Sequence, residues 1–409
     1  MVKDDPMNDM PKEREDVIKS RKGTYEVSFV IRSSMHIVRI GCFIRLFQIL
    51  EILGKGSFGA VFRVRRMEDG KDLAMKCESY KVKKQILRHE AKVLEGMRKI
   101  NSVHFISYED RGKIAGRFMF VVIRLIKAKL TLEVGKNLWD LRMENPERRF
   151  SMATGIRAAE QTLSGIRDLH ICGYLHRDIK PPNFAIGREE DGNPHTIYIL
   201  DFGLCRKYRT DDKDLRYMRE KAAFRGTTRY ASIGALDMVS FNYNSFDYLD
   251  TEIFLKKDQC RKDDVEAWWY MVLEWMIGQL PWKHCRVSSP YFTLEALKNL
   301  TISIEMHRAS IQGADRAENL LRKERRFTTM TLHYLFKVLK HTPEEYMANI
   351  ILYIDTLEYN SIPDYDHIAA HLEAAMQAYH LSYSEPLDWD LMTEYKGPRY
   401  VKNLDYELK

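Results

Sequence analysis

The spacing of apolar residues gives the first part of the chain mostly strand patterns and the later part mostly helix patterns. Short apolar runs bounded by polar residues or glycine predict buried strands, and longer segments with apolar residues every three or four positions predict helices. The predicted strands are 49–53, a segment ending at Lys76, 118–125 and 197–200, and the predicted helices are 83–97, 138–142, 151–171, 263–276 and 365–378. Because Trp268, Trp269 and Trp275 make the fourth helix apolar nearly all round, we expect them to pack in a core.

The predicted helix 83–97 carries an acidic residue on its apolar face. Glu90 is four residues from both Ile86 and Leu94, which places all three on the same side of the helix. A carboxylate directed toward a core is costly unless a cation meets it. Lys76 is the candidate partner, and exposure of Glu90 at the edge of the apolar stripe is the alternative.

Both ends of the chain lack a strong periodic pattern. Residues 1–43 form an expected flexible or irregular extension, and the polar first residues, through Lys22, predict no secretory signal. Basic residues interrupt the apolar stretch 27–50, so we expect no membrane span. The polar and aromatic tail 381–409 is expected to be irregular.

Composition narrows the class of protein further. The chain has 409 residues, 45% of them apolar, which is enough for a substantial core. Its 65 basic and 58 acidic residues give a net charge of +7, but the basic residues form no stripe with interleaved aromatics, so no nucleic-acid partner is expected. The six cysteines are scattered, which favours free thiols in a reducing compartment, the cytoplasm and/or the nucleus.

Two polar motifs carry the candidate chemistry. The first is His176-Arg177-Asp178-Ile179-Lys180-Pro181-Pro182-Asn183, and the second, Asp201-Phe202-Gly203, follows the predicted strand 197–200. Alone, each residue could be a solvated turn residue. Together and in this order, the motifs are typical of the catalytic loop and metal-binding turn of a protein kinase.

The residue types in these motifs suit phosphoryl transfer, which requires positioning of two oxygens and neutralisation of phosphate charge. Asp178 can accept the proton of a substrate hydroxyl, and Lys180 can reach the transferring phosphoryl group. Asn183 and Asp201 offer oxygen atoms to Mg²⁺. A lysine two residues after Asp178 resembles serine/threonine kinases more than tyrosine kinases.

A glycine-rich segment, Gly54-Lys55-Gly56-Ser57-Phe58-Gly59-Ala60-Val61, precedes these motifs. In a kinase its glycines let the backbone approach the triphosphate, and Val61 covers the adenine. A glycine-rich hairpin without a ligand is the alternative. The residues assigned to ATP binding are Gly54, Gly56, Gly59, Val61, Ala74, Lys76, Glu90, Ile123 at the rear of the pocket and Leu125 in the hinge.

From about residue 49 to 378 the chain resembles the casein kinase 1 group of eukaryotic protein kinases, and within it the tau-tubulin kinase-like branch. The most specific residues are Gly226-Thr227-Thr228-Arg229-Tyr230-Ala231-Ser232-Ile233, which stand where most kinases carry Ala-Pro-Glu. The supporting residues are 176–184, Arg261-Lys262-Asp263-Asp264, Gly278-Gln279-Leu280-Pro281-Trp282 and Pro363-Asp364-Tyr365.

The resemblance implies an α+β, bilobal eukaryotic protein-kinase fold with a small, mostly β N-lobe and a larger, mostly α C-lobe. The expected N-lobe is 44–126 and the expected C-lobe is 127–380. The resemblance also implies ATP and Mg²⁺ as cofactors and protein substrates with acidic or phosphorylated Ser/Thr sites. We expect the protein to be monomeric.

The resemblance assigns further residue roles. Asp264 would anchor the catalytic loop, and Arg229 would help to bind an anion beside the substrate, although a structural ion pair is an equally ordinary role for Arg229. Arg177 could pair with a phosphorylated residue of the activation segment. Only Thr210 offers an aliphatic hydroxyl there, so we expect constitutive activity.

Insertions near 127–134 and 240–254 and an apolar lead-in before Gly54 depart from the family pattern. They could lower activity, so the alternative is a catalytically weak kinase-fold scaffold or binding protein. No catalytic residue is lost, which favours an active serine/threonine kinase.

Overall fold

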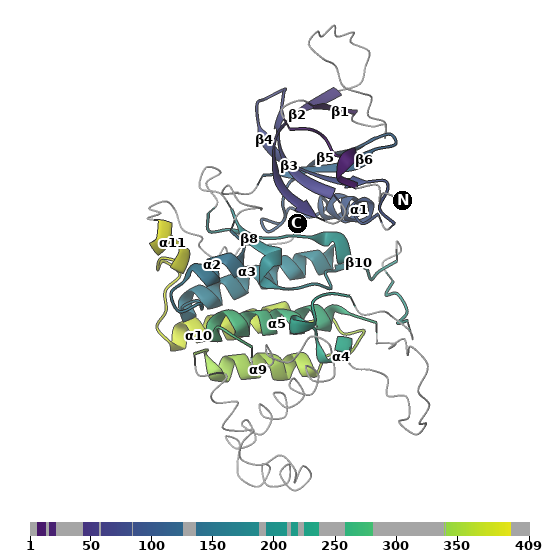
Figure 1. The fold of residues 1–409 in the computed structure, drawn as a ribbon. Helices are drawn as coiled ribbons and strands as arrows, with labels where there is room; N and C mark the ends of the chain where they lie inside the picture. The colour runs from purple at the N-terminus through teal and green to yellow at the C-terminus, as the bar shows by residue number, and fades with distance from the viewer. Residues whose placement is uncertain are drawn as a thin grey trace, which may run out of the picture. The chain divides into compact units, whose positions relative to one another are not determined.

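The structure is a computed structural model that describes residues 6–13, 16–21, 44–56, 59–83, 85–125, 136–187, 194–210, 214–219, 225–236, 258–280, 339 and 341–393. The chain divides into two compact units (Figure 1). The N-terminal unit comprises residues 1–138 and 184–205, and the C-terminal unit comprises 139–183 and 206–409. The predicted insertions 127–134 and 240–254 lie outside the described residues.

Six strands form an antiparallel sheet in the N-terminal unit, in the order β1-β2-β3-β4-β6-β5. The strands are β1 (Val17–Arg21), β2 (Ile44–Gly56), β3 (Gly59–Arg66), β4 (Asp72–Ser79), β5 (Tyr108–Ile114) and β6 (Phe118–Arg124). The strands predicted at 49–53, before Lys76 and at 118–125 are confirmed. Strand pairing places Val61 of β3 and Val121 of β6 on either side of Lys76.

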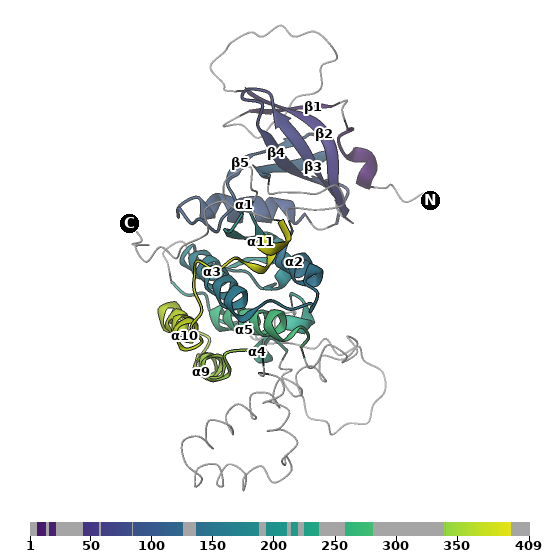
Figure 2. The same ribbon diagram turned by 90° about the vertical axis from the view of Figure 1, so that its left-hand side faces the viewer.

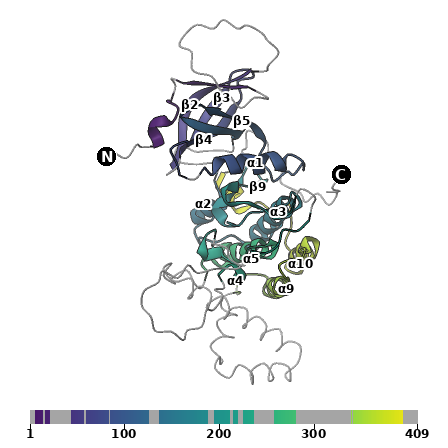
Figure 3. The same cartoon turned by 90° about the vertical axis from the view of Figure 1, so that its right-hand side faces the viewer.

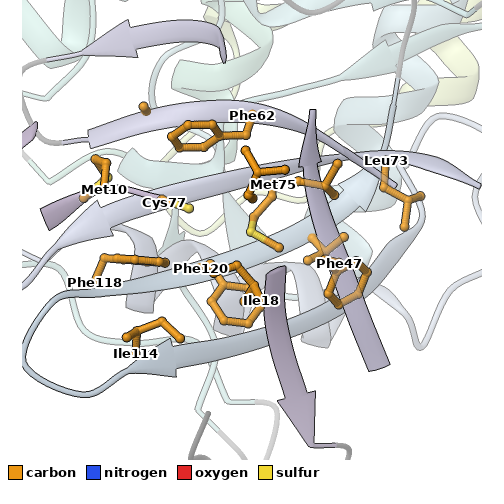
Figure 4. Close-up of a cluster of buried hydrophobic side chains, with 14 residues drawn as sticks. Met10, Ile18, Phe47, Phe62, Leu73, Met75, Cys77, Ile114, Phe118 and Phe120 are labelled. Atoms are coloured by element: carbon orange, nitrogen blue, oxygen red, sulfur yellow. The ribbon is translucent and has the colours of Figure 1, made fainter. Parts of the chain in front are cut away.

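One face of the sheet carries a hydrophobic core (Figure 4). Successive side chains of a strand point to opposite faces, so residues two apart share a face. Eight core residues of the three central strands follow this spacing and are at most 2% exposed: Phe62 and Val64 on β3, Leu73, Met75 and Cys77 on β4, and Phe118, Phe120 and Val122 on β6.

The N-terminal segment contributes to this core, which differs from the prediction that 1–43 is flexible or irregular. Residues Pro6–Asp9 form the short 3-10 helix η1, and β1 pairs with β2. Met10 and Ile18 are buried in the core, with 4% and 3% exposure. The first residues of the chain include few apolar ones among many charged ones, so their sequence shows no periodic pattern. They are ordered because the edge of β2 provides hydrogen-bonding partners for their backbone and the core provides an apolar surface for Met10 and Ile18.

We expect Ile18→Ala to lower the free energy of unfolding by about 2–5 kcal/mol, because it removes a buried side chain and leaves a cavity. Urea denaturation of the full chain measures this change. Lys19→Ala is the matched control on the neighbouring, half-buried position of β1. Equal stabilities of the two variants would show that β1 does not pack as described.

Helix α1 (Leu87–Met97) packs against β4, β5 and β6 (Figure 3). The first N–H groups of a helix have no partner within the helix. The Glu78 carboxylate accepts hydrogen bonds from the backbone N–H groups of Ile86, at 3.0 Å, and Leu87, at 3.1 Å. Glu78 therefore fixes the start of α1 a few residues later than the predicted start at 83.

The antiparallel pair β8 (Phe184–Ile186) and β9 (Ile197–Ile199) confirms the strand predicted before Asp201. Ala185, Tyr198 and Leu200 form a buried cluster with Ile106, and Ile123 of β6 packs against it. This packing groups residues 184–205 with the N-terminal unit, whereas the expected boundaries placed them in the C-lobe.

The C-terminal unit is mostly helical. Its described helices are α2 (Leu138–Glu144, which starts at the boundary), α3 (Met152–Ile171), α4 (Ile233–Leu236), α5 (Arg261–Ile277), α9 (Glu344–Asp355), α10 (Tyr365–Ala378) and α11 (Asp388–Thr393). Helices α5 and α10 each pack against α3 and α9 (Figure 2). In the described parts of the chain, no helix is both long and apolar enough to cross a bilayer.

The predicted apolar helix around Trp268 is confirmed as α5. The side chains of Trp268, Trp269 and Trp275 are completely buried, as expected for core residues. The Trp269 indole N–H donates to the Met347 backbone oxygen of α9 at 2.9 Å. The tryptophans therefore join α5 to its neighbours.

The tail also differs from the prediction of an irregular segment over 381–409. Residues Asp388–Thr393 form α11, and Leu387 and Trp389 are 1% and 3% exposed. The Asp388 side chain accepts hydrogen bonds at the start of α3. This contact links residues more than 230 positions apart, which local periodicity cannot reveal.

Candidate active site

Lys76 of β4 and Glu90 of α1 form an ion pair in the N-terminal unit. The Lys76 Nζ lies 2.7 Å from Glu90 Oε2 and 4.0 Å from Asp201 Oδ1. Burial acts to lower the pKa of Lys76, but the Glu90 and Asp201 carboxylates outweigh it, so the pKa is raised. Glu90 is 6% exposed, so the pairing with Lys76, and not exposure at the stripe edge, is observed.

Asp201 lies directly after the buried strand β9 and Leu200. Its φ of 58° places it in the left-handed region, which is uncommon for a residue other than glycine. Its Oδ1 accepts a hydrogen bond from the Gly203 N–H at 3.4 Å, at the start of the 3-10 helix η3 (Phe202–Leu204). The side chain remains 53% exposed, so its carboxylate can reach a bound cation.

The glycines of the β2–β3 hairpin have different surroundings. A Cβ on Gly59 would lie 2.0 Å from the backbone oxygen of Cys77, so only glycine permits this approach of β3 to β4. A Cβ on Gly54 would meet no atom within 4 Å. Gly56 pairs with Gly59, and Val61 pairs with Gly54. Gly59 thus has a structural reason to be glycine, beside its predicted role at the triphosphate.

The remaining residues assigned to ATP binding lie on β4, on β6 or directly after it. Ala74 of β4 is 7% exposed and pairs with Ile123 of β6, which is half-buried. Leu125 follows β6 and is 6% exposed. Lys76, Ala74 and Ile123 lie on one pair of neighbouring strands and Leu125 directly follows it, while their contact with a nucleotide stays a prediction.

In the C-terminal unit, the catalytic-loop residues converge on Asp178, which is 8% exposed. Asp178 Oδ2 lies 2.7 Å from the Lys180 Nζ, and Asp178 Oδ1 accepts a hydrogen bond from the Thr227 hydroxyl at 2.7 Å. The Asn183 Nδ2 donates to the backbone oxygen of Asp178 at 2.8 Å. Asn183 ends the 3-10 helix η2 (Pro181–Asn183). The carboxylate is thus held between an ammonium group and a hydroxyl.

Thr227 was not among the site residues predicted from the sequence. It donates to Asp178 and accepts a hydrogen bond from Lys180 Nζ at 3.1 Å. Thr227 lies in the segment 226–233, which carries the family resemblance, and this position was the one sequence feature that could have identified it as a site residue. A contact between residues 49 positions apart requires the folded chain.

Gly226 brings Thr227 to the catalytic loop. Its φ is 111°, and a Cβ there would lie 2.4 Å from the Arg177 backbone oxygen. Because the clash involves backbone, we expect Gly226→Ala to displace Thr227 and to lower stability by about 1–3 kcal/mol. Kinase assays measure the effect of displacing Thr227 on activity, and urea denaturation measures the change in the free energy of unfolding.

The matched control is Gly70→Ala, since Gly70 also has a positive φ, 69°, but no atom lies within 4 Å of its added Cβ. Gly70→Ala therefore introduces the strain of a positive φ without a clash between the new Cβ and the backbone. Equal activity of the two variants would contradict the proposed role of Gly226.

Asp264 of α5 holds the backbone of the catalytic loop. Its Oδ2 accepts from the His176 N–H at 2.7 Å and its Oδ1 from the Arg177 N–H at 2.8 Å, while His170 Nε2 lies 2.9 Å from Oδ2. Burial acts to raise the pKa of Asp264, but the hydrogen bond from His170 and the other donors outweigh it and hold the pKa below its usual range. The geometry matches the anchoring role implied by the resemblance.

Arg229, predicted at an anion site, has structural partners. Its Nη1 lies 3.7 Å from Oε1 of the buried Glu274, and its guanidinium lies 5.6 Å from the ring centroid of Trp139. Glu274 also accepts a hydrogen bond from the Tyr230 hydroxyl at 2.5 Å. These contacts favour the alternative role, a structural ion pair.

The fold and these residues define the class of protein. Protein kinases have a lysine that pairs with a helix glutamate, and an aspartate at the end of a strand. They also have a catalytic loop that contains an aspartate, a lysine and an asparagine. This chain has all of these residues. Protein kinases use ATP and a divalent metal ion.

The chain belongs to the protein kinase family, because the protein kinase domain matches residues 47–323. The "Probable serine/threonine-protein kinase" of Dictyostelium discoideum is 27% identical over 348 residues, 84% of this chain and 56% of the relative. The serine/threonine-protein kinase spe-6 of Caenorhabditis elegans is 28% identical over 84% of this chain and 75% of the relative.

Casein kinase I homolog 1 of Schizosaccharomyces pombe is 27% identical over 87% of this chain and 67% of the relative. Similarity to this casein kinase I homologue is consistent with the casein kinase 1 group. The chain spans little more than half of the Dictyostelium relative, at 56% of its length.

Proposed function

We propose that this chain transfers the γ-phosphoryl group of ATP to serine or threonine hydroxyls of protein substrates. The observation that carries the proposal is the Asp178 carboxylate, placed 2.7 Å from both the Lys180 ammonium and the Thr227 hydroxyl. Such a carboxylate can orient a substrate hydroxyl and accept its proton. The names of the relatives, which are serine/threonine-protein kinases, support the choice of acceptor.

The donor groups fit ATP with Mg²⁺. Asp201 presents an exposed carboxylate, and the Asn183 amide nitrogen donates to Asp178, so the amide oxygen is the atom suited to a metal. Among the residues described, no three His, Cys, Asp or Glu side chains form a metal site. Mg²⁺ is usually held by one or two carboxylates together with substrate phosphates, so this sparse set suits it. The bound ion would neutralise charge on the phosphates.

The chain's own residues would do the rest. Glu90 holds Lys76 in place, and Lys76 binds phosphate oxygens of ATP. Asp178 accepts the proton of the acceptor hydroxyl, while Lys180 stabilises negative charge on the transferring group. Thr227 keeps the Asp178 carboxylate oriented through its 2.7 Å hydrogen bond.

We further propose a preference for acidic or phosphorylated acceptor sites. Arg177 and Arg225 line an open pocket together with Asp178 and Thr227. The net charge of +7 also favours acidic substrates. Asp263 and Asp264 line the same pocket, but both accept hydrogen bonds from the chain itself.

The preference is tested with Arg225→Gln. We expect kcat/KM for an acidic serine peptide to fall about two- to fivefold, the range for an exposed charge pair, and kcat/KM for a neutral peptide to stay unchanged. Arg216→Gln is the control, since Arg216 is exposed in the same segment but does not line the pocket. Equal effects of Arg225→Gln on both peptides would reject the preference.

We also propose a reducing compartment, the cytoplasm and/or the nucleus. In the part of the chain that the structure describes, Cys77, Cys172, Cys205 and Cys260 carry thiols. Thiols are the stable form in such compartments. The monomeric state stays a prediction.

A further inference from the structure

The C-terminal segment 382–393 docks on the C-terminal unit through buried side chains. Leu387, Trp389 and Asp390 are 1%, 3% and 4% exposed. The Trp389 ring lies edge-on to Phe150, with centroids 5.7 Å apart. Phe150 lies two residues before the first residue of α3, so the docked segment packs beside the start of that helix.

Asp388 joins the segment to the first turn of α3. Its Oδ2 accepts a hydrogen bond from the Ser151 backbone N–H at 2.7 Å, and its Oδ1 accepts from the Ser151 hydroxyl at 2.7 Å and the Thr154 hydroxyl at 3.0 Å. The Thr154 hydroxyl also accepts from the Asp388 N–H at 3.0 Å. Ser151 is the N-cap of α3, because its Oγ accepts from the Thr154 N–H. The Ser151 hydroxyl is therefore one of the donors that hold the Asp388 carboxylate at the first turn of α3.

Ser151 has the sequence surroundings of a kinase acceptor. Arg148 and Arg149 stand three and two residues before it, in an exposed turn between α2 and α3. Arg148 and Ser151 are exposed, while Arg149 pairs with Glu147 and keeps 28% of its side chain exposed. Guanidinium groups just before a hydroxyl suit a protein kinase whose substrate groove is acidic.

We propose that Ser151 is the phosphorylation site of an arginine-directed protein kinase and that its phosphate releases the segment 382–393. In this step a bond forms between Ser151 Oγ and the γ-phosphorus of ATP bound to that kinase. The bond from the γ-phosphorus to the β–γ bridging oxygen breaks, ADP leaves, and the hydroxyl proton passes to the base of that kinase.

The phosphate changes the charge at the contact. It carries a charge of about −1.5 to −2 and removes the hydroxyl proton that Asp388 accepts. The first turn of α3 tolerates the new anion, because helix N-termini stabilise negative charge. The Asp388 carboxylate is then repelled by its former donor, so the docked segment loses the hydrogen bond between Asp388 and the Ser151 hydroxyl. Its other hydrogen bonds to α3 include those from the Arg157 Nη1 to the Glu385 backbone oxygen and from the Tyr383 hydroxyl to Glu160 Oε1, both at 2.7 Å. Docking and phosphorylation therefore oppose each other.

The test uses the full chain carrying Asp178→Asn, so that its own activity adds little phosphate. The catalytic subunit of the cyclic-AMP-dependent protein kinase, which is arginine-directed, is the probe, with radiolabelled Mg-ATP. We expect phosphate on Ser151, its loss in Ser151→Ala, and slower incorporation in the double variant Arg148→Gln/Arg149→Gln. Backbone hydrogen exchange within 382–393 should rise about 5- to 150-fold on phosphorylation, the usual range of coupling between two sites.

Asp388→Ala removes the competing carboxylate and should speed the phosphorylation of Ser151. Asp366→Asn, a change of a carboxylate with 93% side-chain exposure on α10, should leave both readouts unchanged. Absence of phosphate on Ser151 in the parent and in Asp388→Ala would overturn the acceptor role. Stoichiometric phosphate with unchanged exchange in 382–393 would overturn the release.

Discussion

Replacing Asp178 by asparagine lowers kcat for phosphoryl transfer by about 10²–10⁴-fold, the range for loss of a general base. The amide keeps the shape of the side chain and can still accept the hydrogen bond from Thr227. It cannot accept the substrate proton, and it no longer pairs with the Lys180 ammonium, 2.7 Å away in the wild type. Steady-state assays with Mg-ATP and a serine peptide measure the loss.

Two comparisons distinguish the loss of proton acceptance by residue 178 from a general loss of structure. The dissociation constant for ATP should stay nearly unchanged, because the residues assigned to nucleotide binding are on other strands and loops. Thr227→Ser keeps the hydroxyl that donates to Asp178 and should retain activity. A kcat of Asp178→Asn close to that of the wild type would remove Asp178 from the mechanism.

Replacing Asp264 by asparagine lowers the free energy of unfolding by about 3–5 kcal/mol, the range for breaking a buried charged contact. Asp264 is 2% exposed and accepts from two backbone N–H groups of the catalytic loop and from His170. An amide offers one oxygen in place of two, and its NH₂ group would face a backbone N–H donor. We also expect kcat to fall, because His176 and Arg177 precede Asp178 directly.

Urea denaturation gives the stability change, with Asp366→Asn as the matched control. Asp366 is 93% exposed and lies 3.8 Å from Arg167, so its replacement should change stability by less than about 0.5 kcal/mol. If the two variants unfold at the same urea concentration, the anchoring role of Asp264 is wrong.

Local patterns predicted much of the fold and of the site. The period of apolar residues gave α3, α5 and α10, and the position of Glu90 on the apolar face of its helix predicted its partner, Lys76. The order of the two catalytic motifs predicted the class of protein. These features depend on residues close together in the sequence, so they can be predicted from the sequence alone.

Other features depend on contacts between distant residues. Strand β1 and its buried side chain Ile18 are stable only because β2 and the core cover them. Helix α11 has six residues and is held by Asp388 at the start of α3. Arg229 was assigned by resemblance, whereas its geometry depends on Glu274 of α5.

The central claim is that this chain is an active serine/threonine kinase, and one assay tests it most directly. The wild-type protein is incubated with radiolabelled Mg-ATP and casein or an acidic serine peptide, and the labelled amino acid is identified. The account predicts phosphoserine or phosphothreonine that is lost in Asp178→Asn. Binding of ATP by the wild type without transfer to either substrate or to itself would contradict the account and favour a kinase-fold scaffold.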